Sequence, residues 1–504
     1  MAQTQSNINV AAPGFSGINT QRSPTQLGPE FASVADNSII DRYGRVGCRK
    51  GFNVLTTSVS ALGGKSIEAI HYHGNGVVFS AGNFKVFRDT EPLLDITPAG
   101  ATIVTNQWQI ISFNKSCYFF AVGNDPLVYD DSTDTLTLMT AHASFLGPAP
   151  TGGTALAGFG RVWVGKGDVL QWSDTLAGVK WSGGSTGQLD MNLVWPNGYD
   201  EITAVTEHNN FLIIFGRKSI VIYSGANDPA TMALSDTISG LGCVGKFAYA
   251  STGGDLVFID YSGIRSLGRT IQEKSVPIGD ISANVANDIK SIIVSELADS
   301  EATVTLQYVG KDSYLLAVFS SESITYCFDM RGFLEDGSAR TTIWPVSTTT
   351  STTIHPVNGD LYTGSLVGVS IQGGYLDGVS KIPFKYYSNP MEFGQPVNLK
   401  MLKQVDVTVL GGTGVDMSLA WAYDYASSYK KQVRTLSASF PINYGVGEYA
   451  EATSEYTSGA ILDTEKFNTN GSGVNVTIGI EANIDGEAFS IQALNFQALI
   501  GRII

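Results

Sequence analysis

Residues 76–89 read GVVFSAGNFKVFRD, in which one apolar run, a turn containing Gly and Asn, and a second apolar run follow one another. Such runs of β-branched and aromatic residues around a turn are typical of a β-hairpin. The pattern recurs at intervals of roughly 30 to 50 residues, the spacing of propeller blades. The further segments are residues 116–131, 160–174, 210–225, 255–268, 313–329 and 359–374. The sequence therefore predicts an all-β protein with a β-propeller-like domain over residues 61–380. A large irregular β-sandwich is the alternative.

The residues on either side of this domain follow different patterns. Residues 1–60 are punctuated by Gly and Pro, which predicts an extended N-terminal arm that forms part of a platform. Apolar and polar residues alternate strictly in QVDVTVL (residues 404–410), as expected for a strand buried on one face. Residues 381–504 are predicted to form a C-terminal β-sandwich-like platform domain. A phase shift between Ile491 and Leu494 indicates a β-bulge.

One helix is expected inside the propeller-like domain. In residues 281–297, the side chains of Ile281, Val285, Ile289 and Ile292 recur at helical spacing. Long amphipathic segments are otherwise rare, so this helix is predicted to be an insertion between strands.

The composition limits the classes of protein that fit. Of 504 residues, 43% are hydrophobic and only 15% are charged, so the chain can bury a large core. The net charge of −15 argues against binding nucleic acid by neutralising phosphates, although not against letting DNA pass. The four cysteines are widely spaced and are interpreted as buried thiols. Without a signal-peptide pattern or a long apolar run, a soluble protein with no membrane span is expected.

The segment GLGCVGK, residues 240–246, is the sharpest candidate for chemistry. Gly240, Gly245 and Lys246 match a phosphate-binding loop, and Asp260 ends a following strand as a metal-binding aspartate does. However, Phe247 stands where the Mg²⁺-binding Ser or Thr is required, and a strand pattern replaces the helix that must follow. We therefore interpret the segment as a structural hairpin.

Two other groups of residues have the chemistry of metal ligands. His71 and His73 lie on the same side of a predicted strand, but no third ligand is near in sequence, which favours packing or surface roles. Asp130, Asp131 and Asp134 lack the spacing of a calcium loop and fit a solvated turn. No catalytic residue, cofactor-binding residue or metal ligand is therefore assigned, no cofactor is expected, and the protein is expected not to be an enzyme.

The N-terminal arm adds a resemblance to a known family. Its residues 14–52 read GFSGINTQRSPTQLGPEFASVADNSIIDRYGRVGCRKGF, and they precede the hairpins and a terminal β domain ending FQALIGRII. This arm, the segment GLGCV…DLVFIDYSGIRSL and the domain order resemble the tail nozzle proteins of short-tailed bacteriophages, also called tail tubular protein B or packaged-DNA stabilisation protein. The resemblance covers most of the chain but includes no short diagnostic motif.

The resemblance implies a structural role in the virion tail, after assembly in the host cytoplasm. About six copies would form a ring below the head-to-tail adaptor, extend and close the DNA channel, and retain packaged DNA until ejection. DNA would pass through the lumen without specific binding, and an acidic wall would repel its phosphates. The expected partners are other copies of the chain, the adaptor and tail fibres.

The arm carries a basic cluster in an otherwise acidic chain. Arg42, Arg45, Arg49 and Lys50 are candidate partner contacts, because arginine can anchor a segment on an acidic surface through bidentate bonds. A solvated turn is the alternative for this cluster. For the protein as a whole, a glycan-binding or glycan-cleaving propeller and a monomeric scaffolding propeller also remain open.

Overall fold

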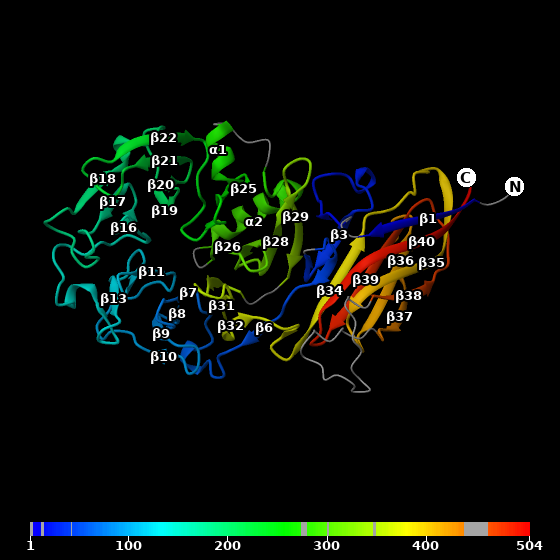
Figure 1. Ribbon diagram of the computed structural model, residues 1–504, viewed down its shortest axis with the longest axis horizontal. Coiled ribbons are helices and arrows are strands. Elements are labelled where there is room, and N and C mark those ends of the chain that lie inside the picture. The colour runs from blue at the N-terminus through cyan, green and yellow to red at the C-terminus, as the bar shows by residue number, and fades with distance from the viewer. Residues whose placement is uncertain are drawn as a thin grey trace, which may run out of the picture. The chain divides into compact units, whose positions relative to one another are not determined.

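The computed structural model describes residues 4–11, 15–41, 43–273, 280–299, 302–345, 349–437 and 462–503. The chain forms two compact units, shown as a ribbon in Figure 1. Unit 1 comprises residues 1–53, 326–345 and 372–504, and unit 2 comprises residues 54–325 and 346–371. Two strands, β6 (Phe52–Val54) and β28 (Ile324–Phe333), each span a division point between the units.

The described residues of unit 2 form seven antiparallel groups of strands. Six groups are separate sheets, and the remaining group, β26 and β27, belongs to an eleven-stranded sheet that also contains β28. The first group contains β7 (Ala69–Tyr72), β8 (Val78–Gly82), β9 (Lys85–Arg88) and β10 (Leu94–Asp95). The second group contains β11 (Gln109–Phe113), β12 (Ser116–Phe120), β13 (Leu127–Asp130) and β14 (Thr135–Leu138). The third group contains β15 (Thr154–Gly158), β16 (Arg161–Lys166), β17 (Val169–Trp172) and β18 (Gly187–Asp190). The fourth group contains β19 (Ile202–His208), β20 (Phe211–Gly216), β21 (Ser219–Ser224) and β22 (Ala233–Ser239). The fifth group contains β23 (Tyr249–Ser251), β24 (Leu256–Asp260) and β25 (Gly263–Ser266). The sixth contains β26 (Val304–Val309) and β27 (Tyr314–Phe319). The seventh contains β30 (Ser351–Ile354), β31 (Leu361–Ser365) and β32 (Gly368–Gln372).

The first strands of these sheets follow one another around a centre (Figure 1). β7 contacts β11, β11 contacts β15, and β15 contacts β19; further along, β23 contacts β26, β26 contacts β30, and β30 contacts β7. The hydroxyl of Tyr249 in β23 donates to the carbonyl oxygen of Val205 in β19 at 3.3 Å. The ring closes where Leu55 N donates to Val369 O at 2.9 Å and Val369 N donates to Thr56 Oγ1 at 3.0 Å. The predicted all-β class and propeller-like domain are confirmed.

Apolar cores join neighbouring blades of the propeller. The core between the first and second blades contains Phe79 and Phe119, whose ring centroids are 5.5 Å apart. Similar clusters join the second blade to the third, the third to the fourth, and the seventh to the first. Because apolar burial is the main favourable term in folding, each of these blades depends on its neighbours for stability.

Short hairpin turns explain why the repeat is visible in the sequence. Two-residue loops of type I′ need positive φ at both positions, which matches the right-handed twist of the flanking strands. Such pairs are Asn83–Phe84 (54° and 56°), Asn114–Lys115 (53° and 66°) and Asn209–Asn210 (48° and 65°). In each pair Asn takes the first position, because its short polar side chain tolerates the left-handed conformation.

Two helices lie between β25 and β26, namely α1 (Leu267–Glu273) and α2 (Ala286–Ala298). The sequence predicted the second, which buries Ile289 and Ile293, but not the first. Short 3-10 turns occur at η1 (Pro24–Gln26), η2 (Ser60–Leu62), η3 (Met139–Ala141), η4 (Met191–Leu193) and η5 (Ala283–Val285). Among the described residues, no helix is both long and apolar enough to cross a bilayer.

Unit 1 is a sandwich of two sheets. The first has the order β38 (Leu462–Asn468), β35 (Asn398–Gly411), β40 (Phe489–Ile503), β5 (Val46–Cys48) and β4 (Ser38–Ile40), with β1 (Thr4–Ala11) also paired to β40. The second belongs to the eleven-stranded sheet that begins β26, β27, β28, and it continues through β29 (Ala339–Trp344), β2 (Gly17–Ile18), β3 (Phe31–Asp36), β34 (Ser380–Ser388), β39 (Val476–Ile484), β36 (Asp416–Tyr423) and β37 (Lys430–Thr435), with β33 (Leu376–Asp377) paired to β34. The rings of Phe384 and Phe489 meet between the sheets with centroids 5.1 Å apart.

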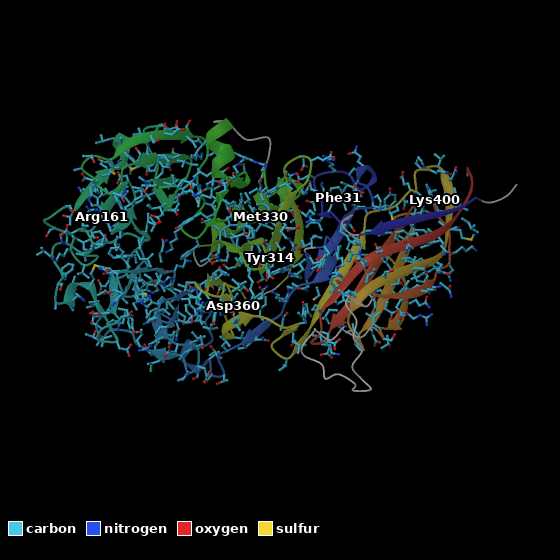
Figure 2. The ribbon with its side chains drawn as sticks, viewed as in Figure 1. Phe31, Arg161, Tyr314, Met330, Asp360 and Lys400 are labelled. Atoms are coloured by element: carbon cyan, nitrogen blue, oxygen red, sulfur yellow. The ribbon has the colours of Figure 1, made fainter. Side chains whose placement is uncertain are left out.

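The alternation predicted for the terminal domain has the expected effect on burial. Val405, Val407 and Val409 of β35 are all fully buried. The predicted bulge is also present in β40: Ala493 pairs with Thr408 and Ile491 pairs with Val409, so Gln492 is the extra residue. Side chains fill the interior of each unit (Figure 2), including the buried Lys400, whose Nζ donates to the carbonyl oxygens of Gln395 and Val474.

The unit boundaries differ from the predicted domain boundaries. Residues 326–345 and 372–380, expected in the propeller, belong to unit 1, whereas residues 54–60 belong to unit 2 rather than to the arm. Backbone pairing is the reason, because β2 and β3 of the arm pair in parallel with β29. Gly17 makes this approach possible: its φ is 81°, and a Cβ there would lie 2.4 Å from the carbonyl oxygen of Thr341.

Candidate functional site

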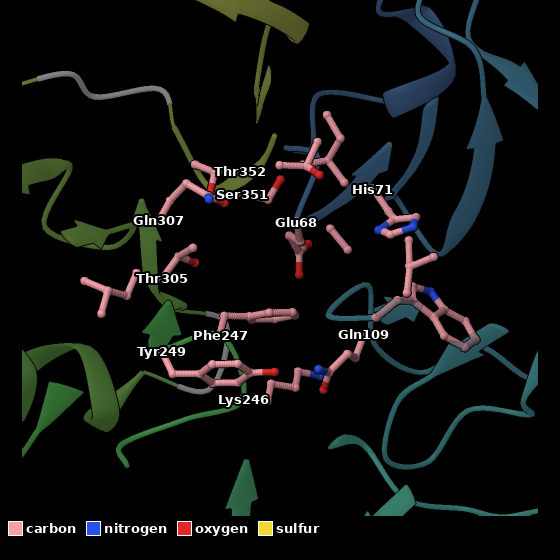
Figure 3. A pocket seen from close by; sticks show the side chains of 16 residues that line it. Glu68, His71, Gln109, Lys246, Phe247, Tyr249, Thr305, Gln307, Ser351 and Thr352 are labelled. Carbon is pink, nitrogen blue, oxygen red and sulfur yellow. The ribbon is translucent and has the colours of Figure 1, made fainter. Parts of the chain in front are cut away.

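A polar cavity of 220 Å³ lies in unit 2, where strands of five blades come together. Its lining comes from β7, β11, β23, β26 and β30 and from adjacent turns (Figure 3). Charged and polar groups at its wall include Glu68, His71, Gln109, Lys246 and Tyr249. The cavity has the mixed polarity of a site for a small polar ligand or water rather than for an apolar molecule.

Lys246 is held in place at this cavity. Its ammonium group donates to the carbonyl oxygen of Gln107 and lies 5.1 Å from the ring centroid of Phe247. Burial lowers the pKa of Lys246 to about 8, because the surrounding protein disfavours the charged form. Lys246 also lines a second cavity of 400 Å³ with residues of β15, β16 and β19.

The GLGCVGK segment does not have the geometry of a phosphate-binding loop. The chain continues from Lys246 into β23 instead of into a helix, so no helix N-terminus faces a phosphate. Asp260 accepts hydrogen bonds from Gly242 N at 3.2 Å and Ser262 N at 3.0 Å. Its carboxylate therefore fixes two turns of the blade, which agrees with the structural interpretation.

His71 and His73 meet a third potential ligand that lies far from them in the sequence. His71 lies in β7, His73 just after it, and Cys117 in β12 of the next blade, and one ligand atom from each lies within 4.8 Å of the others. His73 Nδ1 is 2.9 Å from Cys117 Sγ. Ser112 Oγ lies 2.7 Å from His71 Nε2 and from His73 Nδ1. We call His71, His73, Cys117 and Ser112 the blade 1–2 cluster.

A carboxylate outside this cluster orients one of its imidazoles. Asp131 Oδ1 is 3.1 Å from His73 Nε2 and accepts a hydrogen bond from Asn75 Nδ2 at 2.8 Å. This contact fixes the ring of His73, so that its other nitrogen faces Cys117. Cys117 and Ser112 are themselves direct cross-strand partners in the β11–β12 ladder, which fixes their spacing.

The protein environment disfavours the charged forms of His71 and Cys117. Burial, with a smaller effect of His73, lowers the pKa of His71 to about 4. Burial also raises the pKa of the Cys117 thiol to about 12, against the opposing effect of its hydrogen bond with Ser112. The line Cys117–His73–Asp131 has the order nucleophile, base and orienting carboxylate. However, Cys117 has no exposed surface, so a substrate cannot reach its sulfur without a rearrangement.

The three aspartates at the end of β13 and in the turn after it do not converge on one point. Asp130 accepts from Ser132 N at 2.8 Å, Asp131 pairs with His73, and Asp134 accepts from Arg88 and from Tyr129. Each carboxylate therefore has a separate structural partner, as in a hydrogen-bonded turn. The signal missed in the sequence is that Asp131 lies in the blade that supplies Cys117, in the turn between β13 and β14.

The basic cluster of the arm lies inside unit 1 where it is described, and Arg42 lies outside the described residues. Arg45 is 8% exposed, and its Nε donates to Asp41 at 2.6 Å. Arg49 is 2% exposed and makes a bidentate pair with Asp377, with bonds of 2.9 and 2.5 Å. Lys50 is half-buried, and its carbonyl oxygen accepts from Arg49. The guanidinium groups of Arg45 and Arg49 thus bond within the chain. The role of the cluster as a partner contact stays a prediction.

Comparisons with known proteins give likenesses of fold. No family model and no curated protein matches the chain. A structure of the extracellular domain of BT4673 from B. thetaiotaomicron is 14% identical, with a TM-score of 0.41, and covers 66% of this chain and 41% of that one. The chain thus matches about two fifths of that protein's length. The WD40 domain of Neurospora crassa Pan2 is 8% identical, with a TM-score of 0.40, and covers 64% of this chain and 96% of that domain. No activity or partner follows from likenesses this distant.

Proposed function

We propose that the chain is a structural subunit of a bacteriophage tail, which forms a ring that continues the DNA channel below the adaptor and retains packaged DNA. The proposal combines the sequence resemblance to tail nozzle proteins with the division of the chain into two units. It assigns no catalytic step, and the expectation that the chain is not an enzyme remains part of the proposal.

The observation that carries the proposal is the construction of unit 1 from distant parts of the chain. Within its first sheet, β40 pairs with β1 and β5 of the arm and with β35 of the terminal region. An arm joined in this way to a terminal β domain is what the sequence order of the two segments predicts for a single docking platform. A β-sandwich distinct from the propeller can bind one partner while the propeller contacts another.

The charge of the protein supports the same role. With a net charge of −15, a ring of these subunits has no general attraction for DNA phosphates. A channel wall that does not bind DNA allows the DNA to leave rapidly. Because Arg45 and Arg49 bond within unit 1, we expect adaptor contacts to involve other residues of unit 1 as well.

The mass and shape of the native assembly test the proposal. We expect the chain, expressed together with its adaptor and portal proteins, to form a ring of about six times 53.7 kDa with an open centre in electron micrographs. In phage particles, labelled antibody should mark the tail axis, and particles lacking the chain should lose their DNA. Tailed particles that keep their DNA without the chain would refute the proposal, and a monomer in the presence of the adaptor would favour the scaffolding alternative.

A further inference from the structure

We infer that His71, His73 and Cys117 form a zinc-binding site that joins the first and second blades of the propeller. The inference is independent of the proposed tail function, since it depends on the blade 1–2 cluster alone. Among the described residues, this is the one group of three His, Cys, Asp or Glu side chains gathered closely enough to hold an ion.

The donor atoms have the spacing that a tetrahedral ion needs. Zinc binds imidazole nitrogen at about 2.0 to 2.1 Å and thiolate sulfur at about 2.3 Å, so its ligands lie about 3.3 to 3.6 Å apart. The three donors already lie within 4.8 Å of one another, with His73 Nδ1 2.9 Å from Cys117 Sγ. A widening of this last contact by about half an ångström accommodates the ion. Ser112 Oγ, which contacts both imidazoles, or a water molecule can take the fourth position.

The surroundings of the donors are those of a metal site. A ligating histidine usually bonds to a carboxylate or carbonyl through its second nitrogen, which orients the ring and raises its basicity. His73 does this with Asp131, and Asn75 holds the same carboxylate. The backbone of His73 is fixed in turn, because its N donates to Val77 O at 2.8 Å.

The chemistry of the donors selects the ion. Two imidazoles and a thiolate favour zinc and other late transition metals over Mg²⁺ and Ca²⁺, which prefer oxygen ligands. His71 is partly exposed and lines the 220 Å³ cavity, so we expect an ion to reach the site from its side. On binding, the Cys117 thiol releases its proton to solvent and its sulfur forms the metal bond. The S–H contact with His73 is replaced by a bond to zinc, so no oxidant or reductant is needed.

The competing interpretation is a buried hydrogen-bonded cluster that binds no ion. In that case Cys117, His73 and Ser112 satisfy one another, and the cluster serves only packing between the blades. The two interpretations differ in one measurable property, the affinity for a metal that forms a sulfur bond.

Cobalt(II) provides the test, because it takes the place of zinc and its bond to sulfur gives an intense near-ultraviolet band. The full chain, free of any histidine tag and treated with chelator, is titrated with Co²⁺ and then with Zn²⁺. We expect one equivalent of cobalt, the sulfur band, and loss of the band when zinc displaces cobalt. The band should be absent from Cys117→Ser and present in Cys243→Ser, which removes another fully buried thiol.

Two further variants keep the test decisive if Cys117→Ser folds poorly. His71→Gln changes a partly exposed ligand, and it should abolish the rise in melting temperature that zinc gives the wild type. Asp131→Asn should weaken zinc binding about 10- to 100-fold by loosening His73. Folded wild-type protein that shows no sulfur band at stoichiometric cobalt overturns the inference. So does a band that persists in folded Cys117→Ser or His71→Gln.

Discussion

Replacing Arg49 tests how the arm is attached within unit 1. Besides its bidentate pair with Asp377, the guanidinium donates to Asn37 Oδ1 at 2.8 Å and to Lys50 O at 3.0 Å. It also lies 5.9 Å from the ring centroid of Trp344. Arg49→Ala therefore removes the cationic partner of Asp377 and takes away the donor that several oxygen atoms share.

The expected loss in the free energy of unfolding of unit 1 is about 3 kcal/mol. Breaking a buried ion pair by removing one partner costs about 3 to 5 kcal/mol. We take the lower end, because the side chain of Asp377 is 31% exposed and water can solvate it once it is alone. If the arginine instead lay on the surface, the change would fall within about ±0.5 kcal/mol. Arg49→Lys should lose part of the same stability, because lysine cannot make the bidentate contact.

Hydrogen exchange in increasing denaturant, measured by mass spectrometry, suits this prediction. The method resolves peptides, so the exchange of β3 and β34 in unit 1 is followed separately from that of the propeller. Lys381→Ala is the control, since its exposed pair with Asp485 should contribute less than about 1 kcal/mol. A loss below about 1 kcal/mol for Arg49→Ala, with the control unchanged, would refute the assignment of this pair as an attachment of the arm.

Three other substitutions test the propeller and the parallel pairing. The pKa of Lys246 in the folded protein is about 8, below its ordinary value of 10.5. Between these pH values the free energy of unfolding should therefore rise with pH, by at most about 1.4 kcal/mol per pH unit. Lys246→Met should remove this rise, as measured by chemical denaturation. The wild type should also bind no ATP at micromolar concentrations in calorimetry; binding that is lost in Lys246→Met would restore the phosphate-loop interpretation. Gly17→Ala should cost more than about 1 kcal/mol in unit 1, because of its φ of 81° and the nearby carbonyl oxygen of Thr341, and an unchanged exchange pattern would contradict this. Ile289→Ala, at a fully buried position, should cost about 2 to 5 kcal/mol in thermal unfolding, whereas Val294→Ala at a position 66% exposed should be nearly neutral; equal effects would count against the orientation of α2.

The sequence predicts features that depend on local patterns. Alternating residues and Asn-containing turns identify the hairpins, helical spacing identifies α2, and a phase shift locates the bulge at Gln492. Each of these signals extends over fewer than about twenty residues, which is the range in which periodicity carries information.

Contacts between distant segments are not visible in such patterns. Arg49 and Asp377 are 328 positions apart, and His73 and Cys117 are 44 apart. Whether such residues meet depends on which strands become neighbours, and a single strand pattern does not specify its partner. The bounds of the two units differ from the predicted domain bounds for the same reason, since residues 326–345 belong to unit 1 and pair there with the arm.

The pairing of β1 with β40 determines when unit 1 can form during synthesis. Residues 4–11 pair with residues 493–500, so the first strand leaves the ribosome long before its partner exists. At bacterial and eukaryotic rates of about 5 to 20 residues per second, the interval is roughly 25 to 100 s. The propeller, whose blades are formed by hairpins that are local in the sequence, can fold before β40 is synthesised and becomes available to pair with the arm. A chain interrupted before β40 leaves β1, β5 and β35 without their common neighbour, and these open edges are targets for proteolysis or aggregation. Unit 1 can therefore be completed only in chains that are translated through β40.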